Sequence, residues 1–218
     1  QMMSYYVGTY YFRNKQLNES LTYLEATKLA NLSNAQIGEV KYLLGYIYFS
    51  LGQFEKAKQP LDAVRQSAQD VYYIDANYYF GFIALKEKNY SVALSCFEIA
   101  KSAAAYDKLI PFYNAQIFYF TGSPENALST ALAALKAGGQ YYELPLQQLV
   151  GRLLFAKNDF TGALPYLEKY VAKTKQPSNE DLYELSFCYF EQKKWDKAID
   201  GFKQLTTGKD SLSQNSDL

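Results

Sequence analysis

The chain has 218 residues, 49% of them hydrophobic, which is enough apolar material for a continuous buried core. Its 22 basic and 22 acidic residues balance, and only three of the basic ones are arginine, which argues against a nucleic acid or an anionic membrane as partner. The absence of histidine excludes Ser-His-Asp and Cys-His catalysis and histidine-bound metals. No apolar run approaches the roughly 18 residues that span a bilayer, so membrane insertion is not expected.

One register recurs in six successive units. Counted from the start of a unit, position 8 is small, position 11 is usually aromatic or aliphatic, and position 20 is alanine or serine. The triplets are Gly8/Tyr11/Ser20, Gly45/Tyr48/Ala57, Gly81/Ala84/Ala93, Ala115/Phe118/Ala127, Gly151/Leu154/Ala163 and Ser186/Tyr189/Ala198. The corresponding units span 1–37, 38–73, 74–107, 108–143, 144–178 and 179–212. Successive units begin 34 to 37 residues apart, and a period of this length indicates tandem structural repeats.

Each unit is predicted to contain two helices joined by a short turn. A glycine inside a helix costs about 1 kcal/mol relative to alanine, so its recurrence at position 8 indicates that two helices approach closely there. A polar residue followed by an aromatic or aliphatic one marks most turns, as in Gln53-Phe54. The fourth turn uses Pro124 as first helical residue with Ser123 as expected N-cap. Apolar residues at positions 24 and 27 extend the buried side of the second helix.

This register resembles the tetratricopeptide repeat, in which positions 8 and 20 of a helical hairpin are small. The resemblance covers about 205 of the 218 residues. It departs from the family pattern at position 4, where the expected tryptophan is absent, and in the fourth unit, where Ala115 and Ala131 replace a glycine and a large residue. The resemblance implies an all-α, right-handed solenoid of antiparallel helix hairpins. Residues 206–218 are expected to be a linker towards a seventh repeat, beginning near Ser213 to Ser216.

The two cysteines are predicted to be small buried hydrophobes. Cys96 lies in the third unit and Cys188 in the sixth, and units three apart in such an array do not touch, so the two cannot form a disulfide. A thiolate nucleophile would also lack a histidine base, and no phosphate-binding loop is present. We therefore predict no enzyme activity, catalytic residue, metal or cofactor. Free thiols suit a cytoplasmic protein and, where a signal peptide has been removed, a periplasmic one, so the compartment stays open.

The resemblance also implies a binding surface, the concave groove lined by positions 5, 9 and 12 of each first helix. The residues predicted to line it are Tyr42, Tyr46, Phe49, Tyr78, Phe82, Phe112, Gln116, Tyr119, Gln148, Arg152, Tyr183 and Phe187. About two thirds of this aromatic stripe is expected to pack within and between repeats. Family members that hold a chain-terminal carboxylate have lysine and asparagine at positions 5 and 9, and neither residue occurs there in this sequence.

Three functions remain compatible with these residues. The favoured one is a protein-interaction scaffold that binds a protein or peptide segment through apolar anchors, above all around Tyr46, Phe82 and Phe187, where small polar residues are usual in the family. A glycan-binding groove is the second, because tyrosine faces stack on sugar rings. The third is an architectural spacer or self-assembly element that associates through the ends of the array. No nucleic-acid partner is expected.

Overall fold

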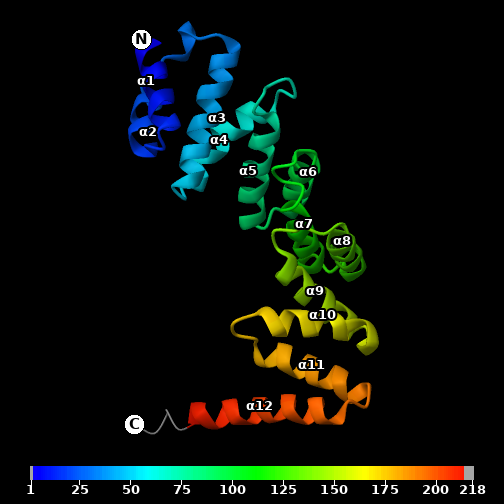
Figure 1. Ribbon diagram of the computed structural model, residues 1–218. Helices are drawn as coiled ribbons and strands as arrows, with labels where there is room; N and C mark the ends of the chain where they lie inside the picture. The colour runs from blue at the N-terminus through cyan, green and yellow to red at the C-terminus, as the bar shows by residue number, and fades with distance from the viewer. Residues whose placement is uncertain (1, 214–218) are drawn as a thin grey trace. The chain divides into compact units, whose positions relative to one another are not determined.

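The computed structural model describes residues 2–213, drawn as a ribbon in Figure 1. Over these residues the chain forms twelve α-helices and one short 3₁₀ helix, η1 (Leu29–Asn31), and no β-strand. The all-α prediction is thus confirmed. The chain divides into two compact units, Gln1–Ile110 and Pro111–Leu218, which we call the N-terminal and the C-terminal unit.

The helices of the N-terminal unit are α1 (Met2–Arg13), α2 (Leu17–Glu25), α3 (Asn34–Ser50), α4 (Phe54–Arg65), α5 (Tyr73–Lys86) and α6 (Tyr90–Ala100). The others are α7 (Ile110–Phe120), which begins at the boundary, α8 (Pro124–Ala137), α9 (Glu143–Ala156), α10 (Phe160–Lys173), α11 (Asn179–Glu191) and α12 (Trp195–Ser213). Each of the six expected repeats holds two helices, its first and its second helix, joined by a short turn (Figure 1). Because α12 runs to Ser213, the expected linker is helical where it begins at residue 206. Residues 214–218, where the seventh repeat is expected to begin, lie outside the described part.

All six first helices end in the same backbone conformation. Position 15 has a positive φ of 59° to 73° in every repeat, at Lys15, Gly52, Lys88, Gly122, Asn158 and Lys193. The next amide then reaches back to the carbonyl at position 11, as Gln53 N does to Tyr48 O at 2.8 Å. These bonds form a Schellman cap, a geometry that glycine usually supplies. Only two of the six residues at position 15 are glycine. The other four adopt the left-handed region of φ, which L-residues rarely adopt, and the backbone hydrogen bonds of the cap hold them there.

The small residue at position 8 makes room for the large side chain at position 24. A Cβ added to Gly45 would lie 2.6 Å from Leu61 Cγ and 3.3 Å from Leu61 N, closer than van der Waals contact permits. Gly8 and Gly151 face Leu24 and Leu167 in the same way. The glycines therefore let α1, α3 and α9 pack closely on α2, α4 and α10, as the register predicted, although the side chain that fills the space belongs to position 24.

The repeats that lack glycine at position 8 compensate on the second helix. In repeat four, Ala115 is matched by alanine, Ala131, at position 24, and both are fully buried in one cluster. In repeat six, Gly201 of α12 lies so close to Ser186 that an added Cβ would be 2.0 Å from the serine Oγ. A larger residue at position 8 of the first helix is thus offset by a smaller residue on the second helix. Because the fourth unit changes both positions, it matches the family pattern least.

Several local predictions are also settled. Cys96 and Cys188 are free and buried, as predicted. Pro124 is the first residue of α8 and Ser123 is its N-cap residue, but the serine side chain makes no cap hydrogen bond. No described helix combines the length and the apolar character needed to cross a membrane.

Candidate partner-binding face

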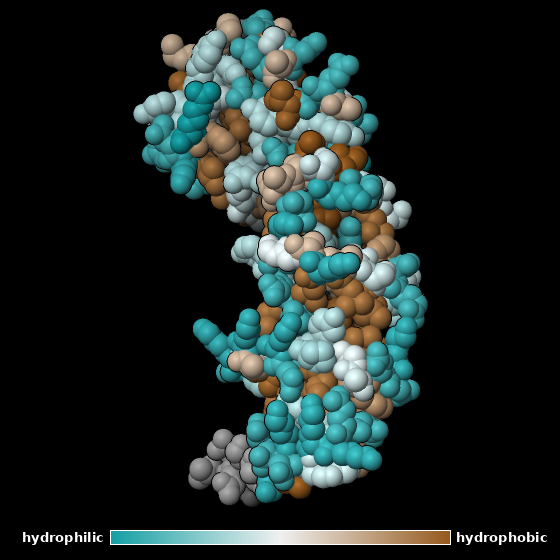
Figure 2. All heavy atoms as spheres, turned by 45° about the vertical axis from the view of Figure 1, so that its right-hand side comes forward, coloured by the Kyte–Doolittle hydropathy of each residue, from teal (hydrophilic) through white to brown (hydrophobic). Residues whose placement is uncertain are grey.

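The twelve residues predicted to line the groove all belong to the first helices α3, α5, α7, α9 and α11. Because positions 5, 9 and 12 are one helical turn apart, they lie on one side of each helix, which we call the first-helix face. Hydrophilic side chains cover much of the surface in Figure 2, and hydrophobic ones are visible between them. Which of the twelve can meet a partner therefore depends on how each is packed.

At position 5, Tyr42 and Tyr78 stack on tyrosines from the connection at the end of the same repeat. Tyr42 lies parallel to Tyr72 at a centroid distance of 4.3 Å, and Tyr78 parallel to Tyr106 at 4.0 Å. The Tyr106 hydroxyl donates to Asp75, and burial, followed by this hydrogen bond, raises the pKa of Tyr106. These rings hold the connections against the helices, so packing is their first role.

The remaining predicted rings of the N-terminal unit are only partly covered. Tyr46, Phe49 and Phe82 are half-buried. Phe49 is 4.8 Å from Tyr79 and 5.5 Å from Phe82, both between ring centroids. Tyr46 meets Tyr79 edge-on at 5.3 Å. Together these four rings form a cluster on α3 and α5 that is continuous and partly accessible.

Three predicted residues lie on α7. The Phe112 ring, also at position 5, is 4.6 Å from Tyr142 of the following connection and is tilted against it by 32°. Gln116 is half-buried, while the side chain of Tyr119 is 47% exposed. Of the three, Tyr119 is the most accessible to a partner.

The first-helix face exposes more aromatic surface at α11. Tyr183, Phe187 and Phe190 follow one another at helical spacing, with centroid distances of 6.0 and 6.1 Å between neighbours. Tyr183 is 47% exposed, Phe190 45% and the adjoining Trp195 of α12 50%. We call these four residues the α11 stripe. Contiguous exposed rings of this kind are uncommon on a protein surface unless they contact something.

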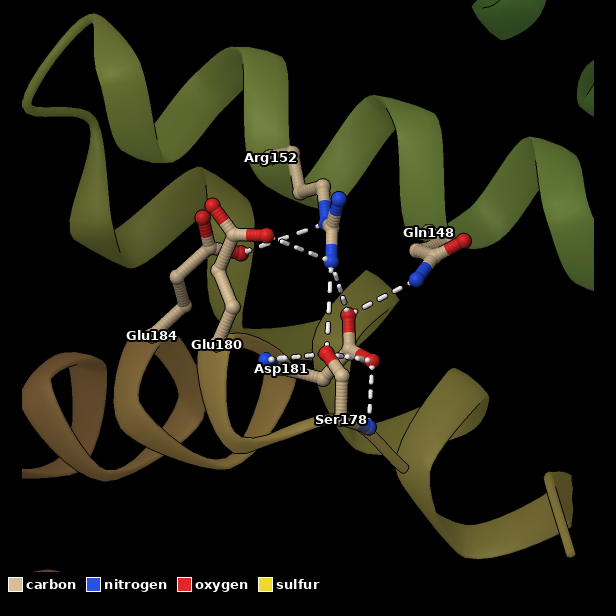
Figure 3. Close-up of polar contacts among 6 residues, drawn as sticks. All are labelled: Gln148, Arg152, Ser178, Glu180, Asp181 and Glu184. Atoms are coloured by element: carbon tan, nitrogen blue, oxygen red, sulfur yellow. Dashed lines mark hydrogen bonds and ion pairs between the residues drawn. The ribbon is translucent and has the colours of Figure 1, made fainter. Parts of the chain in front are cut away.

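A polar network lies beside the α11 stripe, between α9 and the start of α11 (Figure 3). At its centre is Asp181, which is 1% exposed. Its Oδ1 accepts from Gln148 Nε2 at 2.7 Å and from Arg152 Nη2 at 2.8 Å. Its Oδ2 accepts from the Ser178 amide at 2.9 Å and from the Ser178 hydroxyl at 2.6 Å. Ser178 and Asp181 also form the capping box of α11. We call Gln148, Arg152, Ser178, Glu180, Asp181 and Glu184 the Asp181 network.

The network has more acidic than basic groups. Arg152 forms ion pairs with Glu180 at 3.1 Å and with Asp181, whereas its Nε is 3.9 Å from Glu184 Oε2, too far for a hydrogen bond. Among the residues that the structure describes, neither that Nε nor that Oε2 has a hydrogen-bond partner. Glu184 therefore lies buried next to one arginine and two other carboxyl groups.

The two buried carboxyl groups respond differently to this environment. Burial alone would raise the pKa of Asp181, but hydrogen bonds from Ser178, Gln148 and Arg152 outweigh it and hold the pKa below its ordinary value. Burial raises the pKa of Glu184 to about 7, with Glu180 and Asp181 acting in the same direction and Arg152 against them. Near neutral pH, Glu184 is thus partly protonated.

The sequence alone did not reveal the Asp181 network. Gln148 and Arg152 are predicted contacts for a partner, yet in the structure they bind a side chain of the next repeat. The available signal was Asp181 itself, because position 3 is apolar in the other five repeats, at Met3, Val40, Ala76, Ile110 and Leu146. A carboxylate at such a buried position needs donors nearby, and positions 5 and 9 of the preceding repeat supply them.

Two segments, residues 38–61 and 182–207, match family models described as tetratricopeptide repeat. The chain contains tetratricopeptide repeats. No curated protein matches the sequence. Among solved structures, PilF of Pseudomonas aeruginosa is 13% identical, with a TM-score of 0.65 over 94% of this chain and 90% of that one. MamA from Desulfovibrio magneticus RS-1 is 21% identical, with a TM-score of 0.61 over 78% and 92%. A tetratricopeptide repeat protein from Parabacteroides merdae is 16% identical, with a TM-score of 0.52 over 94% and 77%.

These similarities establish the fold as the tetratricopeptide-repeat solenoid, which confirms the predicted fold class. Tetratricopeptide repeats are in general scaffolds for protein–protein interaction and are typically not enzymes. That general function is the one the fold of this chain supports.

Proposed function

We propose that the first-helix face binds an apolar segment of a protein partner, and that the α11 stripe is its principal anchor site. The observation that carries the proposal is the exposure of three large aromatic side chains, Tyr183, Phe190 and Trp195, which are 45% to 50% accessible on adjoining helices. Aromatic anchors at the centre of an interface typically contribute about 2 kcal/mol or more each.

The charge beside the stripe supports a partner with a basic residue next to its apolar anchors. Glu180 exposes 66% of its side chain and Arg152 only 30%, and the Asp181 network holds three carboxyl groups against one guanidinium. A lysine or arginine of the partner that approaches Glu180 would meet a net negative surface. Such rim charges act mainly on association rate and orientation.

The test compares a double variant of the stripe with a matched control. Tyr183→Ser combined with Phe190→Ser removes two stripe rings, while Tyr141→Ser removes a tyrosine that is 74% exposed and lies outside the first-helix face, in the α8–α9 connection. Partners captured from a lysate by the parent protein are identified by mass spectrometry, and the dissociation constant of the purified partner is then measured. The stripe variant should bind at least about 30-fold more weakly, and the control should bind as the parent does.

The charge is tested separately with Glu180→Gln. We expect a slower association with the same partner at low ionic strength and a smaller difference at high salt. An unchanged affinity of the stripe variant, with its melting temperature unchanged, would rule out the α11 stripe as the binding site. Displacement of the partner by a soluble oligosaccharide would instead support the glycan-binding function.

A further inference from the structure

Position 11 of the first helix has a repeated structural role. In repeat two, the Tyr48 hydroxyl donates to Glu25 of the preceding repeat. In repeat six, the Tyr189 hydroxyl donates to Glu168 Oε1 at 2.7 Å, and that glutamate has the same position, 25, as Glu25. A tyrosine ring thus bridges successive repeats at equivalent places in the two units, with its hydroxyl on a position-25 carboxylate.

Each of these rings is also covered by a cation from position 19. The Lys56 ammonium group is 5.6 Å from the centroid of Tyr48, and that of Lys197 is 5.1 Å from the centroid of Tyr189. A cation over an aromatic face is attracted by the negative charge of the ring face. Tyrosine at 11, lysine at 19 and glutamate at 25 of the preceding repeat therefore form one recurring ring site.

Repeat three lacks the ring. Its residue at position 11 is Ala84, whereas the other five repeats have a large residue there: Tyr11, Tyr48, Phe118, Leu154 and Tyr189. Its residue at position 19 is Val92. At this place the N-terminal unit has a cleft of about 420 Å³. Its lining comes from α4, α5 and α6 and includes Arg65, Phe80, Ile83, Ala84, Val92 and Ser95. We call it the Ala84 cleft.

The Ala84 cleft also contains cations, although they come from α4 and not from position 19, which is Val92 in this repeat. The Arg65 guanidinium lies 4.4 Å from the centroid of Phe80 and 3.1 Å from Asp62, which is the position-25 carboxylate of repeat two. Lys58, which forms an ion pair with Glu87 at 2.8 Å, adds a second cation to the lining. The lining of the cleft thus combines apolar walls with two cations, and Arg65 connects it to the carboxylate of Asp62.

We propose that the Ala84 cleft binds the phenol ring of a tyrosine side chain supplied by a protein partner. The ring would occupy the volume that Tyr48 and Tyr189 fill in their own repeats, with its face towards the cations. Its hydroxyl would lie next to the guanidinium group of Arg65, whose partner Asp62 holds the same position, 25, as Glu25 and Glu168. The site is formed by second helices α4 and α6 together with α5, so it is independent of the α11 stripe and of the function proposed for it.

The probe for this site is p-cresol, which is the side chain of tyrosine alone. Titration into the isotopically labelled protein should shift the methyl resonances of Ala84, Val92 and Ile83, with a dissociation constant in the millimolar range, about what eight non-hydrogen atoms allow. Toluene, which has the same ring without the hydroxyl, should bind at least about threefold more weakly. No saturable shift with p-cresol would overturn the proposal, and equal binding of toluene would overturn its assignment to a phenol.

Filling the cleft from within supplies the matched variants. Ala84→Tyr restores the side chain of repeats two and six and should weaken p-cresol binding by about tenfold or more. Ala133→Tyr adds the same side chain at an exposed position of α8 and should bind p-cresol as the parent does. Ala84→Leu, which copies Leu154 of repeat five, fills the cleft without a hydroxyl and is the second variant should Ala84→Tyr fail to fold. Binding of p-cresol to both filled variants at parent affinity would overturn the proposal.

Discussion

The connections of the N-terminal unit and the connection between repeats five and six are held by different physical means. In the N-terminal unit, loop tyrosines stack on position 5, as Tyr72 does on Tyr42 and Tyr106 on Tyr78. Between repeats five and six, the connection is held by the buried carboxylate of Asp181 and the donors around it. A connection between successive repeats can therefore be held either by stacked rings or by a buried, hydrogen-bonded carboxylate.

The two solutions differ in what they tolerate. A stacked ring gains free energy from area and contact, which decline gradually when the ring is altered. A buried carboxylate is stable only while its donors are present, because an unpaired charge in the protein interior is very unfavourable. The aromatic connections are therefore robust to single changes in polar groups, whereas the connection at Asp181 depends on the donors Gln148, Arg152 and Ser178.

The largest expected effect comes from removing the carboxylate at the centre of the network. Asp181→Ala should lower the free energy of unfolding of the C-terminal unit by about 3 to 5 kcal/mol, because Arg152 and Gln148 lose their common acceptor and α11 loses its capping box. Urea unfolding followed by circular dichroism measures it. Asp181→Leu combined with Gln148→Leu and Arg152→Leu, which gives the apolar position 3 of the other repeats, should recover most of that loss. A loss under about 1 kcal/mol for Asp181→Ala would contradict this account.

The aromatic connection is tested at Tyr106, which is 8% exposed. Tyr106→Ala should cost about 3 kcal/mol, since it removes the stacked partner of Tyr78 and leaves a cavity. Tyr106→Phe keeps the ring and removes only the hydroxyl group, which donates to Asp75, so it should cost about 1 kcal/mol. Thermal unfolding of the two variants separates the contribution of the stacked ring from that of the hydroxyl group. Equal losses would mean that the hydrogen bond, and not the stack, holds this connection.

Packing inside the hairpins distinguishes the units as well, because the N-terminal unit keeps glycine at position 8 throughout. Gly45→Ala should destabilise by about 1 to 3 kcal/mol, since the new methyl group meets Leu61. In the background of Leu61→Ala, which copies the Ala115 and Ala131 pair of repeat four, the same substitution should be neutral or stabilising. A double-mutant cycle from urea unfolding measures the coupling. Additive effects would show that the two residues do not share this space.

The smallest effect expected is the pH dependence of Glu184. Its pKa in the folded protein is about 7 against an ordinary 4.5, so the folded state holds this proton more tightly than the unfolded state does. The resulting stabilisation is complete below the ordinary value and is lost as the pH rises through about 7. Glu184→Gln cannot ionise. Its free energy of unfolding, relative to that of the parent, should therefore rise by about 1 to 2 kcal/mol between pH 5 and pH 8.

The control for that measurement is Glu191→Gln, an exposed glutamate of the same helix. Melting temperatures of the parent and both variants are compared at pH 5, 6, 7 and 8. A Glu184→Gln variant whose advantage does not grow between pH 5 and pH 8 would mean that the carboxyl group is not held protonated by burial.

The sequence by itself determined the helical hairpins and the close approach of their two helices. This was possible because the pattern inside one repeat is local: Gly45, Tyr48 and Ala57 lie within one hairpin, and burial of an apolar stripe requires their spacing. Free, buried cysteines followed from the same reasoning. The identity of the partner-binding residues stays a prediction.

Only the tertiary structure decided how one repeat meets the next. Gln148 and Asp181 are 33 residues apart, and Tyr42 and Tyr72 belong to different ends of their repeat. Whether an aromatic or polar side chain at position 5 faces solvent or packs on a neighbour depends on what that neighbour supplies, and a single repeat does not contain this information. The Ala84 cleft has the same origin, because an alanine in a buried register is unremarkable until the adjoining helices are seen to leave its volume open.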